Sequence, residues 1–139
     1  MCIRDREIGQ GSDDVLASIV AEVLGLDTFD IRLYTGDTDL GPVDLGSYSS
    51  RVTIMAGNAA LQAADRAKSI LADAISEKLN VPKDRLKFQG KRVFDSAAPE
   101  NGVTFQEAVC LAEARFGTIA TVGSYTPPKS PALYKGGGV

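Results

Sequence analysis

The sequence contains no histidine and only two cysteines, Cys2 and Cys110. Without histidine, the chain cannot use an imidazole as an acid–base catalyst or build a Ser-His-Asp triad, and most zinc sites are excluded. Two cysteines are too few for a disulfide framework or a four-thiolate cluster. These absences predict a reduced, cytoplasmic protein.

Long hydrophobic runs and an excess of positive charge are also missing. The apolar runs are short, so we expect no membrane partner. The 15 basic and 18 acidic residues give a net charge of −3, which argues against a nucleic-acid partner because phosphate binding needs a basic face. The chain does have 139 residues, 44% of them hydrophobic, which is enough for the core of one domain and too little for two.

Both ends of the chain look cut. Residues 1–6 resemble the translation of a transposase adapter, and we interpret them as a scar that the fold prediction leaves out. Residues 7–139 then form a partial domain that ends in a connector rich in proline and glycine, residues 126–139. We therefore expect a fragment of a longer chain, truncated at both ends; the alternative is a complete small protein with frayed ends.

The spacing of apolar residues separates helical from extended stretches. It predicts a helix from Ser12 or Asp13 to Leu24, a long alanine-rich helix over 52–79 and a short helix over 104–117. Strands are expected at 30–34 and 118–125, with a hairpin at 86–88 and 93–94 in which Gly90 takes a positive φ. Residues 35–50 form a polar loop of a length that is usually functional or disordered. The sum is a helix-rich α+β fold in two layers.

Two segments that precede predicted helices are candidate binding sites. Gly9-Gln10-Gly11-Ser12 combines flexible glycines with an amide that can both donate and accept, at a helix N-terminus that favours an anion or an oxo group. The alternative is an ordinary tight turn. Gly46-Ser47-Tyr48-Ser49-Ser50-Arg51 offers hydroxyl groups and a guanidinium, which suit a phosphate or pyrophosphate. It lacks the Gly-Lys-Ser/Thr ending of a P-loop, and a solvated capping loop is the alternative.

Three other clusters have a structural interpretation and a functional alternative. Asp37, Asp39 and Asp44 suit turns and caps better than a metal site, because the calcium-loop pattern fails. Cys110 lies beside an apolar helical stripe and is expected in the core, with a reactive thiol as the alternative. The remaining cluster is basic and is expected to form the solvent-facing surface of the hairpin rather than a nucleic-acid site: Lys83, Arg85, Lys87, Lys91 and Arg92.

Three motifs in order resemble the molybdenum hydroxylases, the family of xanthine dehydrogenase and aldehyde oxidase. They are the segments 7–12, 35–39 and 46–51, and the resemblance extends over residues 7–139. Within the family, the segments 44–51 and 123–128 are most similar to the large subunit of the 4-hydroxybenzoyl-CoA reductase branch. The resemblance implies that the α+β fragment is a piece of a molybdopterin-binding domain.

The resemblance also implies a cofactor and the residues that hold it. The cofactor is molybdopterin with molybdenum, in its cytosine dinucleotide form. Gly9, Gln10 and Gly11 are implied at the pterin and molybdenum end. The pterin and phosphate portion is implied to contact the second segment, namely Ser47, Tyr48, Ser49, Ser50 and Arg51. No catalytic and no metal-ligating residue is assigned within the chain.

The activity implied is that of a longer parent enzyme. In the family, the catalytic glutamate lies beyond Val139 and an earlier glycine-rich cofactor loop lies before Glu7, so the fragment alone is expected to be inactive. The implied partners are [2Fe-2S] and FAD subunits or domains of the same enzyme, with a small molecule or a CoA thioester as substrate. The alternative function is a non-catalytic α+β module that binds a nucleotide or a protein partner.

Overall fold

The computed structural model describes residues 2–3, 7–37, 39 and 52–126. The described part is built around three helices: α1 (Ser12–Leu24), α2 (Gly57–Leu79) and α3 (Phe105–Phe116). Three short helical turns join them, η1 (Thr28–Asp30), the π-helical η2 (Val52–Ala56) and η3 (Lys83–Arg85). The strands are β1 (Cys2–Ile3), β2 (Tyr34–Thr35), β3 (Leu86–Gln89), β4 (Arg92–Asp95) and β5 (Ala98–Thr104).

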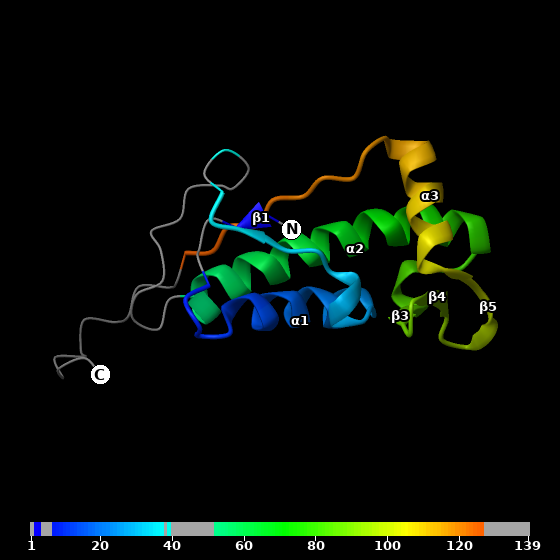
Figure 1. Ribbon diagram of the computed structural model, residues 1–139. Coiled ribbons are helices and arrows are strands. Elements are labelled where there is room, and N and C mark those ends of the chain that lie inside the picture. The colour runs from blue at the N-terminus through cyan, green and yellow to red at the C-terminus, as the bar shows by residue number, and fades with distance from the viewer. Residues whose placement is uncertain (1, 4–6, 38, 40–51, 127–139) are drawn as a thin grey trace, which may run out of the picture.

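Helices α1 and α2 lie side by side and run in the same direction, so their N-termini share one end of the molecule (Figure 1). Small residues on α2 make the close approach possible: a Cβ added at Gly57 would lie 3.2 Å from the Ile19 side chain. Leu16 of α1 and Ala60 of α2 are buried in one small core together with Ala56. The parallel placement is the feature that positions the candidate site, because each predicted binding segment immediately precedes one of these two helices.

The opposite end of α2 carries a second and larger core. Strands β3, β4 and β5 form an antiparallel sheet in that order, with a register shift between Phe94 and Asp95. The sheet and α3 pack against the last turns of α2, where Ile75 and Val93 are fully buried. Thr104 and Glu107 form the expected capping box of α3. At this end α2, α3 and the sheet therefore surround one core.

The C-terminal end of α1 contacts the hairpin of β3 and β4, and this contact connects the two cores. Gly25 ends α1 with a φ of 67°, and a Cβ placed there would overlap the backbone of Phe88 in β3. The Lys91 N–H donates to the Gly25 carbonyl at 2.9 Å. Gly90 and Lys91 have φ values of 59° and 62°, which is the two-residue hairpin geometry that matches strand twist. The expected positive φ at Gly90 is confirmed.

The predicted fold class is confirmed, but three local predictions are wrong. The strand expected at 30–34 is instead the turn η1 followed by the two-residue β2, which pairs in parallel with β1. The strand expected at 118–125 has no strand partner among the described residues and runs extended along α2. This segment forms hydrogen bonds with α2 in both directions. Thr121 Oγ1 donates to the Ala63 carbonyl of the helix at 2.9 Å, and the Arg66 side chain of the helix donates to the Val122 carbonyl.

The third wrong prediction concerns Cys110, which is exposed rather than buried in the core. Ala108 and Ala112 fill the core side of α3. Cys110 stands two residues from each, about 200° around the helix, which turns it to the solvent side.

The sequence pattern does not predict strand β5. Among the described residues, no helix has the length and apolar character needed to cross a membrane.

Candidate functional site

The turn before α1 consists of Gly9, Gln10 and Gly11. Both glycines have positive φ values, 97° and 74°, and a Cβ added at either would meet no atom within 4 Å. The space beside the backbone is therefore open, as a close-approaching ligand requires. Gly11 is the N-cap residue of α1 and has no side chain with which to cap the helix.

The Glu7 carboxylate supplies the missing cap. Its Oε1 accepts from the N–H groups of Gly9 at 2.7 Å and Gly11 at 3.0 Å, and its Oε2 accepts from the Asp13 N–H and the Ser12 hydroxyl, both at 3.1 Å. These bonds, that of the Asp13 N–H first and that of the Gly11 N–H next, lower the pKa of Glu7 from its ordinary 4.5 to about 2. Backbone donors at a helix N-terminus attract an anion, and here the chain's own carboxylate occupies that position.

The Gln10 carboxamide is oriented by two hydrogen bonds within the same turn. The Ile8 N–H donates to Gln10 Oε1 at 2.7 Å, and Gln10 Nε2 donates to the Ser12 hydroxyl at 2.8 Å. Gln10 itself is exposed at the apex of the turn, whereas Ser12 is buried. The turn thus presents one amide of fixed orientation on a backbone that Glu7 holds.

The second predicted segment lies outside the described residues. This holds for Ser47, Tyr48, Ser49, Ser50 and Arg51, so the structure says nothing of their placement. The residue that follows them, Val52, packs against the small core around Leu16 in the first turns of α1.

The described side chains around the turn are acidic. Glu7, Asp13, Asp14, Asp37 and Asp39 belong to this end, and the Thr35 hydroxyl donates to Asp13 Oδ2 at 3.3 Å. Asp37 accepts from the Asp39 N–H at 2.9 Å, the turn role predicted for it, while Asp44 lies outside the described residues. The described portion of the chain contains no group of three or more metal-binding side chains.

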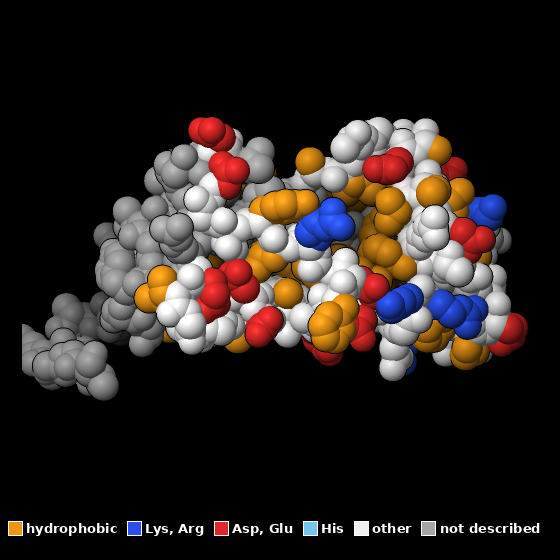
Figure 2. Space-filling view, viewed as in Figure 1, with side chains coloured by type: hydrophobic (Ala, Val, Ile, Leu, Met, Phe, Trp, Pro, Cys, Tyr) orange, Lys and Arg blue, Asp and Glu red, His pale blue; other side chains and the backbone are white. Residues whose placement is uncertain are grey.

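Lys and Arg side chains gather at the opposite end, over the hairpin, and blue also appears over the middle of this face (Figure 2). All five members of the predicted basic cluster are exposed, and three of them pair with acids: Lys83 with Asp73, Arg85 with Asp95, and Lys91 with Asp30. The prediction of a solvated hairpin face is confirmed. Among these acids Asp95 is buried. Its carboxylate is satisfied there, because it accepts hydrogen bonds from Arg85 Nε at 3.0 Å and from the Ala97 N–H at 3.0 Å.

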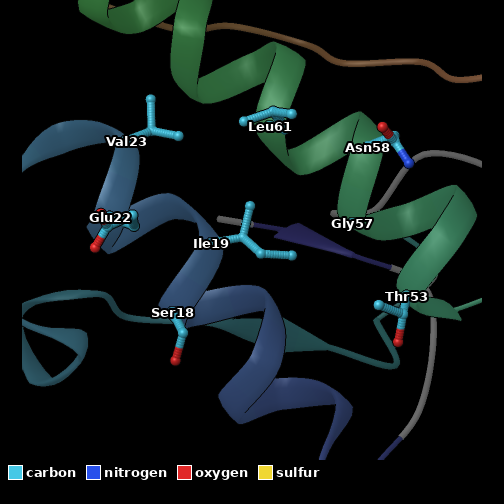
Figure 3. A pocket seen from close by; sticks show the side chains of 8 residues that line it. All are labelled: Ser18, Ile19, Glu22, Val23, Thr53, Gly57, Asn58 and Leu61. Carbon is cyan, nitrogen blue, oxygen red and sulfur yellow. The ribbon is translucent and has the colours of Figure 1, made fainter.

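A groove of about 520 Å³ lies between the middle of α1 and the start of α2 with the preceding η2 (Figure 3). Ile19, Val23 and Leu61 form its apolar walls. The polar lining is sparse and comes from α1, η2 and α2: Ser18, Glu22, Thr53 and Asn58. Asn58 donates to the Ile54 carbonyl at 2.6 Å. Of the predicted site residues that the structure describes, Gly9, Gln10 and Gly11, none lines this groove.

Comparison with known families gives one match that covers nearly the whole chain. Residues 4–137 match the family described as the molybdopterin cofactor-binding domain. The match includes both predicted binding segments. It gives no support to the alternative of a stand-alone nucleotide- or partner-binding module.

Curated relatives and solved structures agree with this match. The carbon monoxide dehydrogenase large chain of Afipia carboxidovorans is 32% identical over 86% of this chain and 16% of its own length. A probable hypoxanthine oxidase of Escherichia coli is 31% identical over 88% of this chain and 13% of its own length. The structure of reconstituted CO dehydrogenase from Oligotropha carboxidovorans superposes with a TM-score of 0.76 at 30% identity, over 89% of this chain and 16% of that one. The chain thus spans about one sixth of the relatives' length.

Proposed function

The chain belongs to the family of molybdopterin cofactor-binding domains, and on that premise we propose that its two N-terminal helix entries hold one cofactor between them. The observation that carries the proposal is the parallel placement of α1 and α2 (Figure 1). It brings the Gly9–Gly11 turn and the chain entering Val52 to the same end of the molecule. Ser47–Arg51 would then face the turn.

The two segments take different parts of the cofactor. The open space beside Gly9 and Gly11 fits the flat pterin, with the Gln10 amide toward the molybdenum end. Phosphates are not expected at this turn, because Glu7 already fills its donors and the neighbouring side chains are acidic. The hydroxyls of 47–50 and the Arg51 guanidinium are the groups that suit the phosphates.

The cofactor supplies redox chemistry at molybdenum when it is bound, and this chain's residues bind and orient it. We propose the cytosine dinucleotide form, as the resemblance implies. The 139-residue chain by itself is expected to be inactive. The whole protein is proposed to be a cytoplasmic molybdenum-dependent oxidoreductase whose large subunit contains this segment, with [2Fe-2S] and FAD carried by other subunits or domains.

A reductive CoA-thioester reaction, of the 4-hydroxybenzoyl-CoA reductase kind, is the proposed activity of that enzyme. Its support is the similarity of the segments 44–51 and 123–128 to that branch. Hydroxylation of a purine, an aldehyde or an N-heterocycle is the second candidate. Its support is the names of relatives, which include the probable hypoxanthine oxidase and quinoline 2-oxidoreductase from Pseudomonas putida 86, 25% identical with a TM-score of 0.70.

Metal and nucleotide analysis of the complete subunit tests the cofactor assignment. The subunit purified from its full reading frame should contain molybdenum and release CMP on acid hydrolysis. The Gln10→Ala variant should lose molybdenum by about ten-fold, a loss typical of removing a group that orients a metal site. Wild-type molybdenum content in Gln10→Ala would remove the turn from the cofactor site.

Turnover assays separate the two candidate activities. The complete enzyme should oxidise a reduced viologen dye when 4-hydroxybenzoyl-CoA is added. Hypoxanthine or quinoline with an oxidised dye should give no turnover. The reverse pattern would replace the reductase proposal with the hydroxylase.

A further inference from the structure

A single carboxylate organises the whole Gly-Gln-Gly turn. Glu7 receives four hydrogen bonds, three from backbone N–H groups and one from the Ser12 hydroxyl. In most helices a Ser, Thr, Asp or Asn at the N-cap position satisfies such donors. Here the N-cap is Gly11 and the acceptor comes from a residue that lies before the turn. Because Glu7 accepts these hydrogen bonds, the Gln10 side chain at the apex is not needed as a helix cap.

The same carboxylate determines which way the Gln10 amide faces. An ionised carboxylate only accepts hydrogen bonds, so the Ser12 hydroxyl must donate its hydrogen to Glu7. The Ser12 oxygen then has lone pairs to offer, and Gln10 Nε2 donates to it. On the other side, the Ile8 N–H can only donate, which selects Gln10 Oε1. The Ile8 N–H and the Ser12 hydroxyl therefore both favour the same orientation of the Gln10 amide, with Oε1 toward Ile8 and Nε2 toward Ser12.

We propose that Glu7 is a positioning residue of the cofactor site: it holds the Gly-Gln-Gly backbone and, through Ser12, orients the Gln10 amide toward the cofactor. This inference rests on the proposed function of the turn and adds a residue to it. Glu7 acts through Gln10 and Ser12 and makes no contact with the cofactor itself. It also keeps anionic groups of the cofactor away from the N-terminus of α1, because its own charge occupies that position.

Four variants of the complete subunit test the proposal: Glu7→Gln, Ser12→Ala, Gln10→Ala and the double variant Glu7→Gln/Gln10→Ala. Asp14→Asn is the matched control, since it removes one negative charge from the first turn of the same helix. Two quantities are measured for each variant. They are molybdenum per polypeptide, by elemental analysis, and hydrogen exchange of the peptide covering residues 7–13, by mass spectrometry.

Glu7→Gln should lower the molybdenum content about ten-fold and speed exchange of the Gly9, Gly11 and Asp13 amides. Ser12→Ala should lower the molybdenum content while leaving those amides protected, because the backbone bonds to Glu7 remain. The double variant should lose no more than Gln10→Ala alone, since residues that act through one group are not additive. Asp14→Asn should match the wild type.

Two results would overturn the inference while leaving the proposed function intact. One is a loss in Gln10→Ala with no loss in Glu7→Gln. The other is a double variant whose loss is the product of the two single losses, which would make Glu7 a helix cap independent of Gln10. A Gln10→Ala variant with full molybdenum content is a different result, because it removes the proposed function of the turn and this inference with it.

Discussion

The two ends of α2 differ in how completely they are buried. At the hairpin end, residues from α2, α3 and the sheet form a core that includes Leu71, Ile75 and Val93. At the end with the Gly-Gln-Gly turn, the described core consists of Leu16, Ala56 and Ala60. Large apolar side chains stay exposed near that smaller core, among them Ile8, Val15, Ile54 and Leu61.

The difference teaches that the end with the Gly-Gln-Gly turn has the smaller core of its own. Apolar surface left in contact with water marks a region that packs against something else. The chain spans about one sixth of the length of these relatives. The hairpin end has the larger core, although Phe29 and Phe116 stay exposed there.

The largest predicted effect tests the asymmetry of the cores. Ile75 is 0% exposed at the hairpin end, and Ile75→Ala should lower the free energy of unfolding by about 2–5 kcal/mol, because it removes buried methyl groups and leaves a cavity. Leu61→Ala is the counterpart on the groove side of α2, where the side chain is 38% exposed, and should cost roughly 1 kcal/mol. Urea denaturation measures both. Equal losses would show that the two ends are buried alike.

An intermediate effect is expected where the two regions touch. Gly25→Ala should lower the free energy of unfolding by about 1–3 kcal/mol, because it combines a left-handed φ with an overlap on the Phe88 backbone. Gly90→Ala separates the two causes, since Gly90 has a similar φ of 59° and open space around its Cβ position. Thermal denaturation should therefore place Gly25→Ala below Gly90→Ala. If the two melt together, the contact between α1 and β3 contributes nothing.

The smallest effect concerns pH at the end with the turn. Folding lowers the pKa of Glu7 from 4.5 to about 2, so the stability from this carboxylate is fully present above its unfolded value and is lost as the pH falls toward its folded value. Wild type should melt above Glu7→Gln at neutral pH, and the gap should close between about pH 5 and pH 2. Calorimetry at a series of pH values measures the gap. A gap independent of pH would mean that charge on Glu7 does not hold the turn.

Local patterns predicted the helices and the hairpin well. The residues that end them act on their nearest neighbours: Gly25 and Asn80 end α1 and α2 in left-handed conformations, and Thr104 with Glu107 begins α3. The failures involve partners distant in sequence. Segment 98–104 contains proline, asparagine and glycine and resembles a loop, but pairing with β4 makes it a strand. Apolar and polar residues alternate in segment 118–125 as in a strand, but the segment packs on α2 and pairs with no strand among the described residues.

The candidate site also contains residues that the sequence predicts and one, Glu7, whose contacts only the fold reveals. The motif predicts Gly9, Gln10 and Gly11 as a binding turn, and this stays a prediction. The hydrogen bonds of Glu7 could not be predicted locally, because they require the backbone to fold back over its carboxylate. The segment 47–51 remains a prediction from its hydroxyl groups and its guanidinium.

Sequence alone determined the helical elements, the family resemblance and the residue types at the turn, since all three depend on neighbours along the chain. Only the tertiary structure decided that α1 and α2 run in parallel, that Glu7 fills the helix N-terminus, and that the larger of the two described cores lies at the hairpin end. Those features come from packing between segments far apart in sequence, where small residues such as Gly57 and Ala60 permit an approach that no local pattern encodes.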